Sequence, residues 1–152
     1  MSFSEYVVFG LGEGEYGIDI SFTQEIIRIP QTVKMPNVPS YIEGMISLRD
    51  RVIPVINLAK RFGLPEEDRG ADGRVVVLNL ERMLLGIIVD DVKEVLQIDD
   101  LSIENIYREI PGVSKNSIKG IGKTNGRLIV LLDVLSLKED ILKYDNEEEL
   151  YS

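Results

Sequence analysis

The chain contains no cysteine, no histidine and no tryptophan among its 152 residues. Without cysteine it can form no disulfide and no thiolate metal site, and it has no thiol nucleophile. Without histidine it lacks the side chain that most often serves as a general base or metal ligand near neutral pH. We therefore expect no catalytic residues, no metal site and no cofactor.

Positive charge is also scarce, because 17 lysines and arginines face 26 aspartates and glutamates, a net charge of −9. This balance argues against binding to nucleic acid or to an anionic membrane surface. The N-terminus lacks the basic and apolar regions of a signal peptide. Apolar runs such as Leu84–Val89 span six residues, whereas a membrane-spanning helix needs about 20. These features predict a soluble, cytoplasmic protein without direct membrane insertion.

Two blocks of the sequence occur twice. The segment from Tyr6 to Ile29 matches a later segment at an offset of 69, and the segment from Ile42 to Leu58 matches one at an offset of 76. The matched pairs include Gly17 with Gly86, Glu25 with Glu94, Gly44 with Gly120, Arg51 with Arg127, and Asn57 with Asp133. Although period-2 apolar strands resemble one another by chance, the paired glycines and glutamates favour an internal duplication.

Each half is rich in short β-branched and aromatic runs separated by glycine or proline, which predicts strands and tight turns. The predicted strands are 5–11, 16–20, 52–57, 74–80, 83–89 and 93–98. Because four to five strands per half suit a small barrel, the sequence predicts an all-β fold with short helices. We expect one domain over 1–152, built from two five-stranded β-barrels (about 6–58 and 75–134) related by a pseudo-twofold. Pro54, inside one strand, indicates an edge or a bulge.

A C-terminal helix is predicted over residues 136–144. Ser136 is the expected N-cap, with Glu139 at the capping-box position. The residues that follow, 145–152, form an acidic tail.

Three motifs could carry other chemistry. Gly10-x-Gly-x-Gly could cradle a phosphate, but no helix is expected to follow it, so a hairpin turn is the better interpretation. The acidic pairs Asp90-Asp91 and Asp99-Asp100 could bind a hard cation, yet they follow strands and are typical of turns. A small-molecule-binding barrel or a hydrolase remains an alternative, for which convergent carboxylates in a groove would be needed.

Two polar segments are candidates for protein contacts. The turn Arg49-Asp50-Arg51 lies beside an apolar strand, and Thr23-Gln24-Glu25 opens another strand. Arginine beside a groove is common in protein interfaces, although a solvated loop would look the same. Since Glu94 repeats Glu25, a structural role for both glutamates is the second possibility.

The sequence resembles the CheW family of bacterial chemotaxis over about residues 5–142. The resemblance rests on Glu15-Tyr-Gly-Ile-Asp-Ile20 with Gln24-Glu25-Ile26, and on Ile42-Glu-Gly-Met-Ile-Ser-Leu-Arg49 with Val52-Ile-Pro-Val-Ile-Asn-Leu58. It implies a non-enzymatic adaptor between the helical hairpin tip of chemoreceptors and the regulatory domain of the chemotaxis histidine kinase. By position, Thr23 and Glu25 would bind the kinase, and Gly44, Ser47, Arg49 and Gly86 would serve receptor binding.

The resemblance also implies a monomer in isolation, located in the cytoplasm at receptor arrays. One departure from the family is Asp50, which stands where a glycine is usual, so the turn there is expected to differ. An adaptor for a kinase outside chemotaxis is the alternative within the same family.

Overall fold

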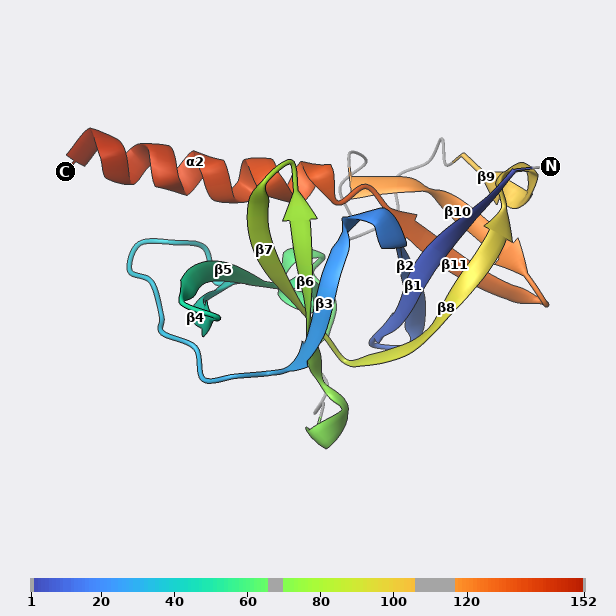
Figure 1. The fold of residues 1–152 in the computed structure, drawn as a ribbon, viewed down its shortest axis with the longest axis horizontal. Coiled ribbons are helices and arrows are strands. Elements are labelled where there is room, and N and C mark those ends of the chain that lie inside the picture. Colours follow the sequence, from blue (N-terminus) through green and yellow to red (C-terminus); the bar gives the residue numbers. More distant parts are fainter. Residues whose placement is uncertain (1, 66–69, 106–116, 152) are drawn as a thin grey trace.

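The computed structural model describes residues 2–65, 70–105 and 117–151. They form two sheets side by side, with one long C-terminal helix that runs over the five-stranded sheet (Figure 1). The strands are β1 (Phe3–Leu11), β2 (Gly14–Asp19), β3 (Thr23–Arg28), β4 (Ile42–Leu48), β5 (Arg51–Asn57), β6 (Arg74–Leu80), β7 (Met83–Val89), β8 (Asp91–Asp99), β9 (Ile103–Glu104), β10 (Ile118–Thr124) and β11 (Arg127–Leu132). The helices are α1 (Leu58–Arg61) and α2 (Leu135–Tyr151), with 3-10 turns η1 (Ile20–Phe22), η2 (Gly70–Asp72) and η3 (Asp100–Ser102).

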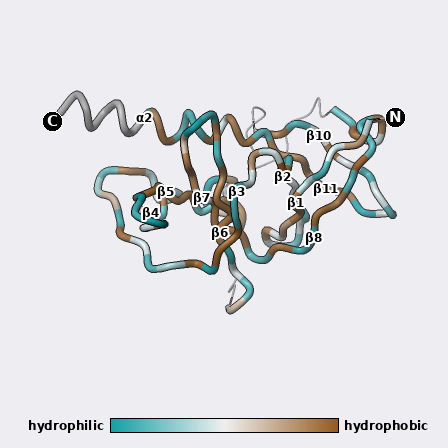
Figure 2. Tube along the Cα trace, viewed as in Figure 1, coloured by the Kyte–Doolittle hydropathy of each residue, from teal (hydrophilic) through white to brown (hydrophobic). Residues whose placement is uncertain are grey.

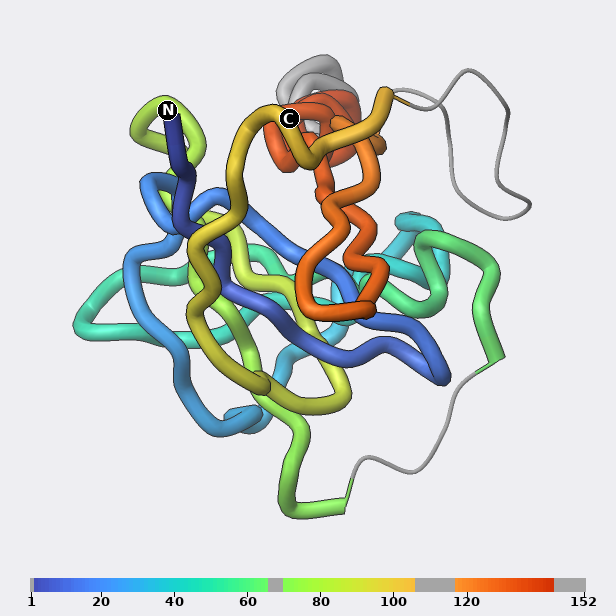
Figure 3. Tube along the Cα trace, turned by 90° about the vertical axis from the view of Figure 1, so that its right-hand side faces the viewer, coloured from blue at the N-terminus to red at the C-terminus, as the bar shows by residue number. Residues whose placement is uncertain are grey.

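The predicted all-β class is confirmed, but the barrels are not closed by hydrogen bonds. One sheet has six strands in the order β8-β1-β2-β11-β10-β9, and the other has five in the order β3-β6-β7-β5-β4. The six-stranded sheet nevertheless curls, so that β8 and β10 approach each other (Figure 3). Curling follows from strand twist and from the bulges in β8 and β10.

Strands from both halves of the chain make up each sheet. The β1–β2 hairpin pairs with β8 and, in parallel, with β11, both from the second half. The β6–β7 hairpin pairs with β3 and, in parallel, with β5, both from the first half. The expected barrels of residues 6–58 and 75–134 are therefore interwoven, because each hairpin finds its neighbours in the other half.

The continuous apolar runs reflect burial on both faces of a strand. In β6, Val75 and Val77 pack inside the five-stranded sheet, whereas Val76 and Leu78 join a large core shared by the two sheets. Figure 2 shows hydrophobic residues along these central strands. A third cluster, around Tyr6, lies inside the six-stranded sheet. Three hydrophobic clusters, one within each sheet and one between the sheets, thus stabilise the interwoven strands.

A polar residue after the last strand of each half caps the helix that follows. The Asn57 Oδ1 accepts a hydrogen bond from the Lys60 N–H at the start of α1. The Asp133 Oδ1 accepts one from the Leu135 N–H at the start of α2. The expected cap at Ser136 was wrong, since its hydroxyl donates to the Asp133 carbonyl from inside the helix. The helix also continues to Tyr151, because glutamate and leucine are good helix formers.

Pro54 does not mark an edge strand, because β5 lies between β7 and β4. It sits one residue before the stretch of β5 that pairs with β7, so its missing N–H removes no bond to that neighbour. A bulge does occur opposite, in β4 between Ile42 and Gly44. In the part of the chain that the structure describes, no helix is long and apolar enough to cross a membrane.

Candidate functional site

An ion pair joins the two segments that the sequence singled out. Glu25 lies on β3, an edge of the five-stranded sheet, and Arg49 lies in the turn between β4 and β5 at the opposite edge. The Arg49 Nη2 donates to the Glu25 Oε2 at 3.1 Å. The Arg49 side chain is 80% exposed and that of Glu25 is 20% exposed. The ion pair thus links the edge strand β3 to the β4–β5 turn, although no backbone hydrogen bonds join the two edges of this sheet.

The turn that presents Arg49 has an unusual backbone. Arg49 and Asp50 have φ values of 48° and 66°, both in the left-handed region. Two such residues between paired strands give a type I′ turn, which matches the twist of a hairpin but favours asparagine and glycine. Asn125 and Gly126 hold the corresponding turn between β10 and β11, with φ values of 49° and 75°. Asp50 therefore leaves the turn type unchanged, contrary to the expectation.

Thr23 and Glu25 each keep a buried oxygen without a hydrogen-bond partner. These atoms are the Thr23 Oγ1 and the Glu25 Oε1, both within described residues and on either side of the bulge in β3. Buried polar atoms are normally satisfied, so the two unpartnered oxygens set this end of β3 apart from the rest of the described core.

The two predicted glycines are structural positions rather than surface contacts. Both Gly44 and Gly86 are buried. Gly44 has a φ of 145°, and a Cβ there would overlap the Val33 carbonyl oxygen of the preceding loop. At Gly86 a Cβ would come within 2.8 Å of the Val75 Cγ1. Ser47, by contrast, is exposed on edge strand β4 opposite Val52.

The six-stranded sheet repeats the ion pair with a second acidic partner. Arg127 bridges to Glu15 on β2 with two hydrogen bonds of 2.7 and 3.1 Å, and its Nη1 lies 3.2 Å from the Glu94 Oε2 on β8. Hydrogen bonding to Arg127 lowers the pKa of Glu15, and bonding to Glu15 raises the pKa of Arg127. Glu94, which repeats Glu25, thus also pairs with an arginine, although Arg127 is the repeat equivalent of Arg51 and not of Arg49.

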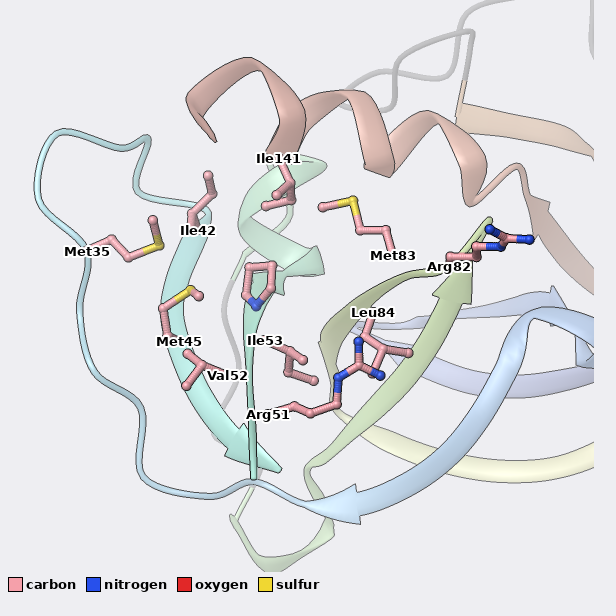
Figure 4. Close-up of a pocket in the computed structure, with 11 residues that line it drawn as sticks. Met35, Ile42, Met45, Arg51, Val52, Ile53, Arg82, Met83, Leu84 and Ile141 are labelled. Carbon is pink, nitrogen blue, oxygen red and sulfur yellow. The ribbon is translucent and has the colours of Figure 1, made fainter. Parts of the chain in front are cut away.

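A groove lined by apolar and polar surface lies next to the β4–β5 hairpin. Met45 and Val52 from the hairpin, Met83 and Leu84 from β7, and Ile141 from α2 surround a cavity of about 280 Å³ (Figure 4). Arg51 and Arg82 also line it. Val52 is 65% exposed and nearby Val33, which pairs with Met45, is 70% exposed. Flexible methionines and exposed valines at one place suit contact with another protein.

Sequence reasoning missed this groove. Its three methionines, Met35, Met45 and Met83, come from a loop and two strands that lie far apart in the chain. One signal was available: they are all the methionines after Met1, and methionine is common at adaptable binding surfaces.

The other candidate motifs have structural partners. The backbone N–H groups of Gly10 and Gly12 donate to the side chains of Asp91 and Asp90, at 3.1 and 2.7 Å. Asp99 caps η3 through the Leu101 N–H, and Asp100 accepts a hydrogen bond from Ser4. Within residues 2–65, 70–105 and 117–143, no three acidic side chains gather as metal ligands would.

Comparisons with known proteins agree with this architecture. The family description "CheW-like domain" matches residues 5–141. The chain is 35% identical to a chemotaxis protein CheW of Treponema pallidum over 88% of this chain and 81% of that protein. It is 31% identical to one of Klebsiella aerogenes over 93% of this chain and 87% of that protein.

A solved structure is similar as well. The scaffolding protein TtCheW of Thermoanaerobacter tengcongensis superposes with a TM-score of 0.81 at 35% identity, covering 88% of this chain and 86% of that one. A family match over most of the length, relatives above 30% identity and the shared fold lead to one conclusion. The chain belongs to the family of CheW-like domains.

Proposed function

We propose that this protein is a non-enzymatic chemotaxis adaptor. It couples the cytoplasmic helical hairpin of chemoreceptors to the regulatory domain of the chemotaxis histidine kinase, and it works in the cytoplasm at receptor arrays. Support comes from relatives named chemotaxis protein CheW and from a structural neighbour described as a scaffolding protein. A protein of this kind needs docking surfaces rather than reactive groups.

The observation that carries the proposal is the exposed edge at Thr23, Glu25 and Arg49. Ion pairing, two unpartnered buried oxygens and exposed apolar side chains occur there together. An interface draws its affinity from apolar anchors and its specificity from polar groups that the partner satisfies. In the proposal the kinase domain contacts Thr23 and Glu25 at this edge.

The receptor is assigned to the neighbouring turn. The Arg49 guanidinium and the Ser47 hydroxyl are exposed and available to it. Gly44 and Gly86 act indirectly in this proposal, because they are buried and set the path of β4 and β7. Substitutions at these glycines would weaken receptor binding by moving the turn.

Titration calorimetry against the purified regulatory domain of the kinase from the same genome tests the kinase contact. We expect binding in the micromolar range or tighter, equivalent to about −8 kcal/mol or more. Glu25→Lys should weaken it, whereas the matched variant Glu94→Lys, on the third strand of the second half, should bind like the wild type. Equal loss in both variants, or no binding by the wild type, would refute the kinase assignment.

Co-sedimentation with receptor fragments that contain the hairpin tip tests the receptor contact. Arg49→Ala and Ser47→Arg should reduce recovery of the adaptor, and Lys123→Ala, which removes only an exposed ion pair, should serve as the control in the other sheet. Each variant is first checked for unchanged thermal unfolding. Full recovery of Arg49→Ala and Ser47→Arg would contradict the assignment of the turn to the receptor.

A further inference from the structure

The turn between β10 and β11 contains the sole Asn-Gly dipeptide in the sequence, Asn125-Gly126. Both residues are exposed, and both have positive φ values, 49° and 75°. This two-residue turn closes the pair between Thr124 and Arg127. We propose that Asn125 is a site of spontaneous deamidation, a covalent modification that needs only water.

The reaction balances without any other reactant. The backbone nitrogen of Gly126 attacks the side-chain Cγ of Asn125, a new N–Cγ bond forms, and the Cγ–NH2 bond breaks. The proton lost from the Gly126 N–H leaves with the amide nitrogen as ammonia. Water then opens the five-membered ring at either carbonyl and gives aspartate or isoaspartate.

The structure leaves the attacking nitrogen accessible. A Cβ added at Gly126 would have nothing within 4 Å, so solvent and the closing ring have room. Across the described residues, neither the Gly126 N–H nor the Asn125 amide has a hydrogen-bond partner. Glycine also lacks the side chain that would crowd the nitrogen.

Other asparagines in the described chain lack one of these conditions. Asn57 is 2% exposed and caps α1. Asn79 accepts a hydrogen bond from the Arg82 N–H and is followed by Leu80. Asn37 is the closest match, because it is exposed with a φ of 59°, but a branched valine follows it. Asn37 is therefore an internal control within the same molecule.

Modification would act on the adjacent ion-pair cluster. Either product places a carboxylate two residues from Arg127, which already binds Glu15 and Glu94. The isoaspartate product also lengthens the backbone of a two-residue turn by one carbon. That turn can no longer hold Thr124 opposite Arg127 in the same register.

The test is peptide mapping by mass spectrometry after the full-length protein is incubated in a mildly alkaline buffer. The peptide containing Asn125 should gain the mass of an NH2-to-OH exchange, with isoaspartate separated by chromatography. We expect at least about tenfold faster conversion at Asn125 than at Asn37, a barrier difference of about 1.4 kcal/mol. Rates at the two sites that agree within error would overturn the proposal.

Two variants complete the experiment. Asn125→Gly keeps a residue suited to positive φ and cannot deamidate, so its thermal unfolding should stay constant on incubation while that of the wild type declines. Asn125→Asp adds the charge without the isoaspartate backbone and separates the two effects. An equal decline in Asn125→Gly and in the wild type would show that this turn is not the site of ageing.

Discussion

Asp50 has a backbone conformation that glycine adopts without steric cost. Its φ of 66° belongs to the left-handed region, where a non-glycine residue costs up to about 1 kcal/mol. Asp50→Gly should therefore raise the free energy of unfolding by about 0.5–1 kcal/mol, which is a gain of roughly 2–4 °C in Tm for a chain of this length. Differential scanning calorimetry measures it.

The control is Asp50→Ala, which removes the same charge but keeps a Cβ. If the alanine variant gained as much stability as the glycine variant, relief of charge would be the cause and the backbone argument would fail. The comparison also bears on the resemblance to the CheW family, from which we expected a glycine at this position. The protein keeps the type I′ turn with aspartate at this position. A gain in the stability of Asp50→Gly would therefore measure how much aspartate destabilises the turn relative to glycine.

Gly44 carries a stricter requirement than an ordinary glycine in a turn. A Cβ at Gly44 would meet the backbone of Val33, while one at Gly12, whose φ is 58°, would meet nothing within 4 Å. Gly12→Ala should cost about 1 kcal/mol of stability from the left-handed backbone alone. Gly44→Ala should cost about 2–4 kcal/mol, because the overlap is added to the strain.

Chemical denaturation of both variants gives the two free energies. If Gly44→Ala and Gly12→Ala lost similar amounts of stability, the loop around Val33 would be able to move away from the added Cβ at no energetic cost. The overlap with Val33 would then not explain why residue 44 is a glycine. The repeat equivalent of Gly44 has a similar constraint, because a Cβ at Gly120 would lie 2.7 Å from the Glu104 carbonyl oxygen. The sequence repeat could not identify the atoms that crowd the two glycines, because the Val33 and Glu104 carbonyl oxygens lie in other segments of the chain.

At the scale of elements, sequence patterns predicted the strands well where both faces are buried. The expected strands 74–80 and 83–89 have the same bounds as β6 and β7, because long apolar runs between tight turns leave little ambiguity. Helix ends were predicted less well. The start of α2 depends on the Asp133 carboxylate, and Ser136 was an equally plausible cap by residue type.

The parallel pair of β2 and β11 is short, and an ion pair across it leads to a pH prediction. The pKa of Glu15 is lowered from 4.5 by its hydrogen bonds to Arg127. A carboxyl group with a lower pKa in the folded state stabilises the protein above its unfolded pKa. That contribution is lost as the pH falls below about 4.5.

Urea unfolding of the wild type and of Glu15→Gln at several pH values tests this. Glu15→Gln should be less stable than the wild type at neutral pH, and the difference should shrink in acid as Glu15 takes up a proton. The matched control is Glu13→Gln in the exposed turn between β1 and β2, which should leave the pH profile unchanged. A constant gap between wild type and Glu15→Gln at all pH values would contradict the linkage.

At the scale of the molecule, the exchange of the β1–β2 and β6–β7 hairpins between the two sheets could not be predicted from sequence. Period-2 patterns say which residues are buried, but they do not say which of several similar strands lies next to which. Each half carries a complete set of strands, so a self-contained barrel for each half was the simpler expectation. The candidate site depends on the exchange as well, because Glu25 and Arg49 meet across a sheet whose centre, β6 and β7, comes from the other half.

This exchange predicts that neither half folds alone. A fragment of residues 1–64 would have the β1–β2 hairpin without β8 and β11, and β3 and β5 without β6 and β7. Most of the buried apolar surface of each strand would then be exposed, and a lone two-stranded hairpin is marginally stable in water. We expect residues 1–64 and 70–152 each to show poorly dispersed amide resonances and no cooperative thermal transition. Mixed in equal amounts, they should regain both. If either fragment unfolded cooperatively by itself, its sheet would have to form from one half of the chain, and the interwoven pairing of β3 with β6 and of β1 with β8 would be refuted.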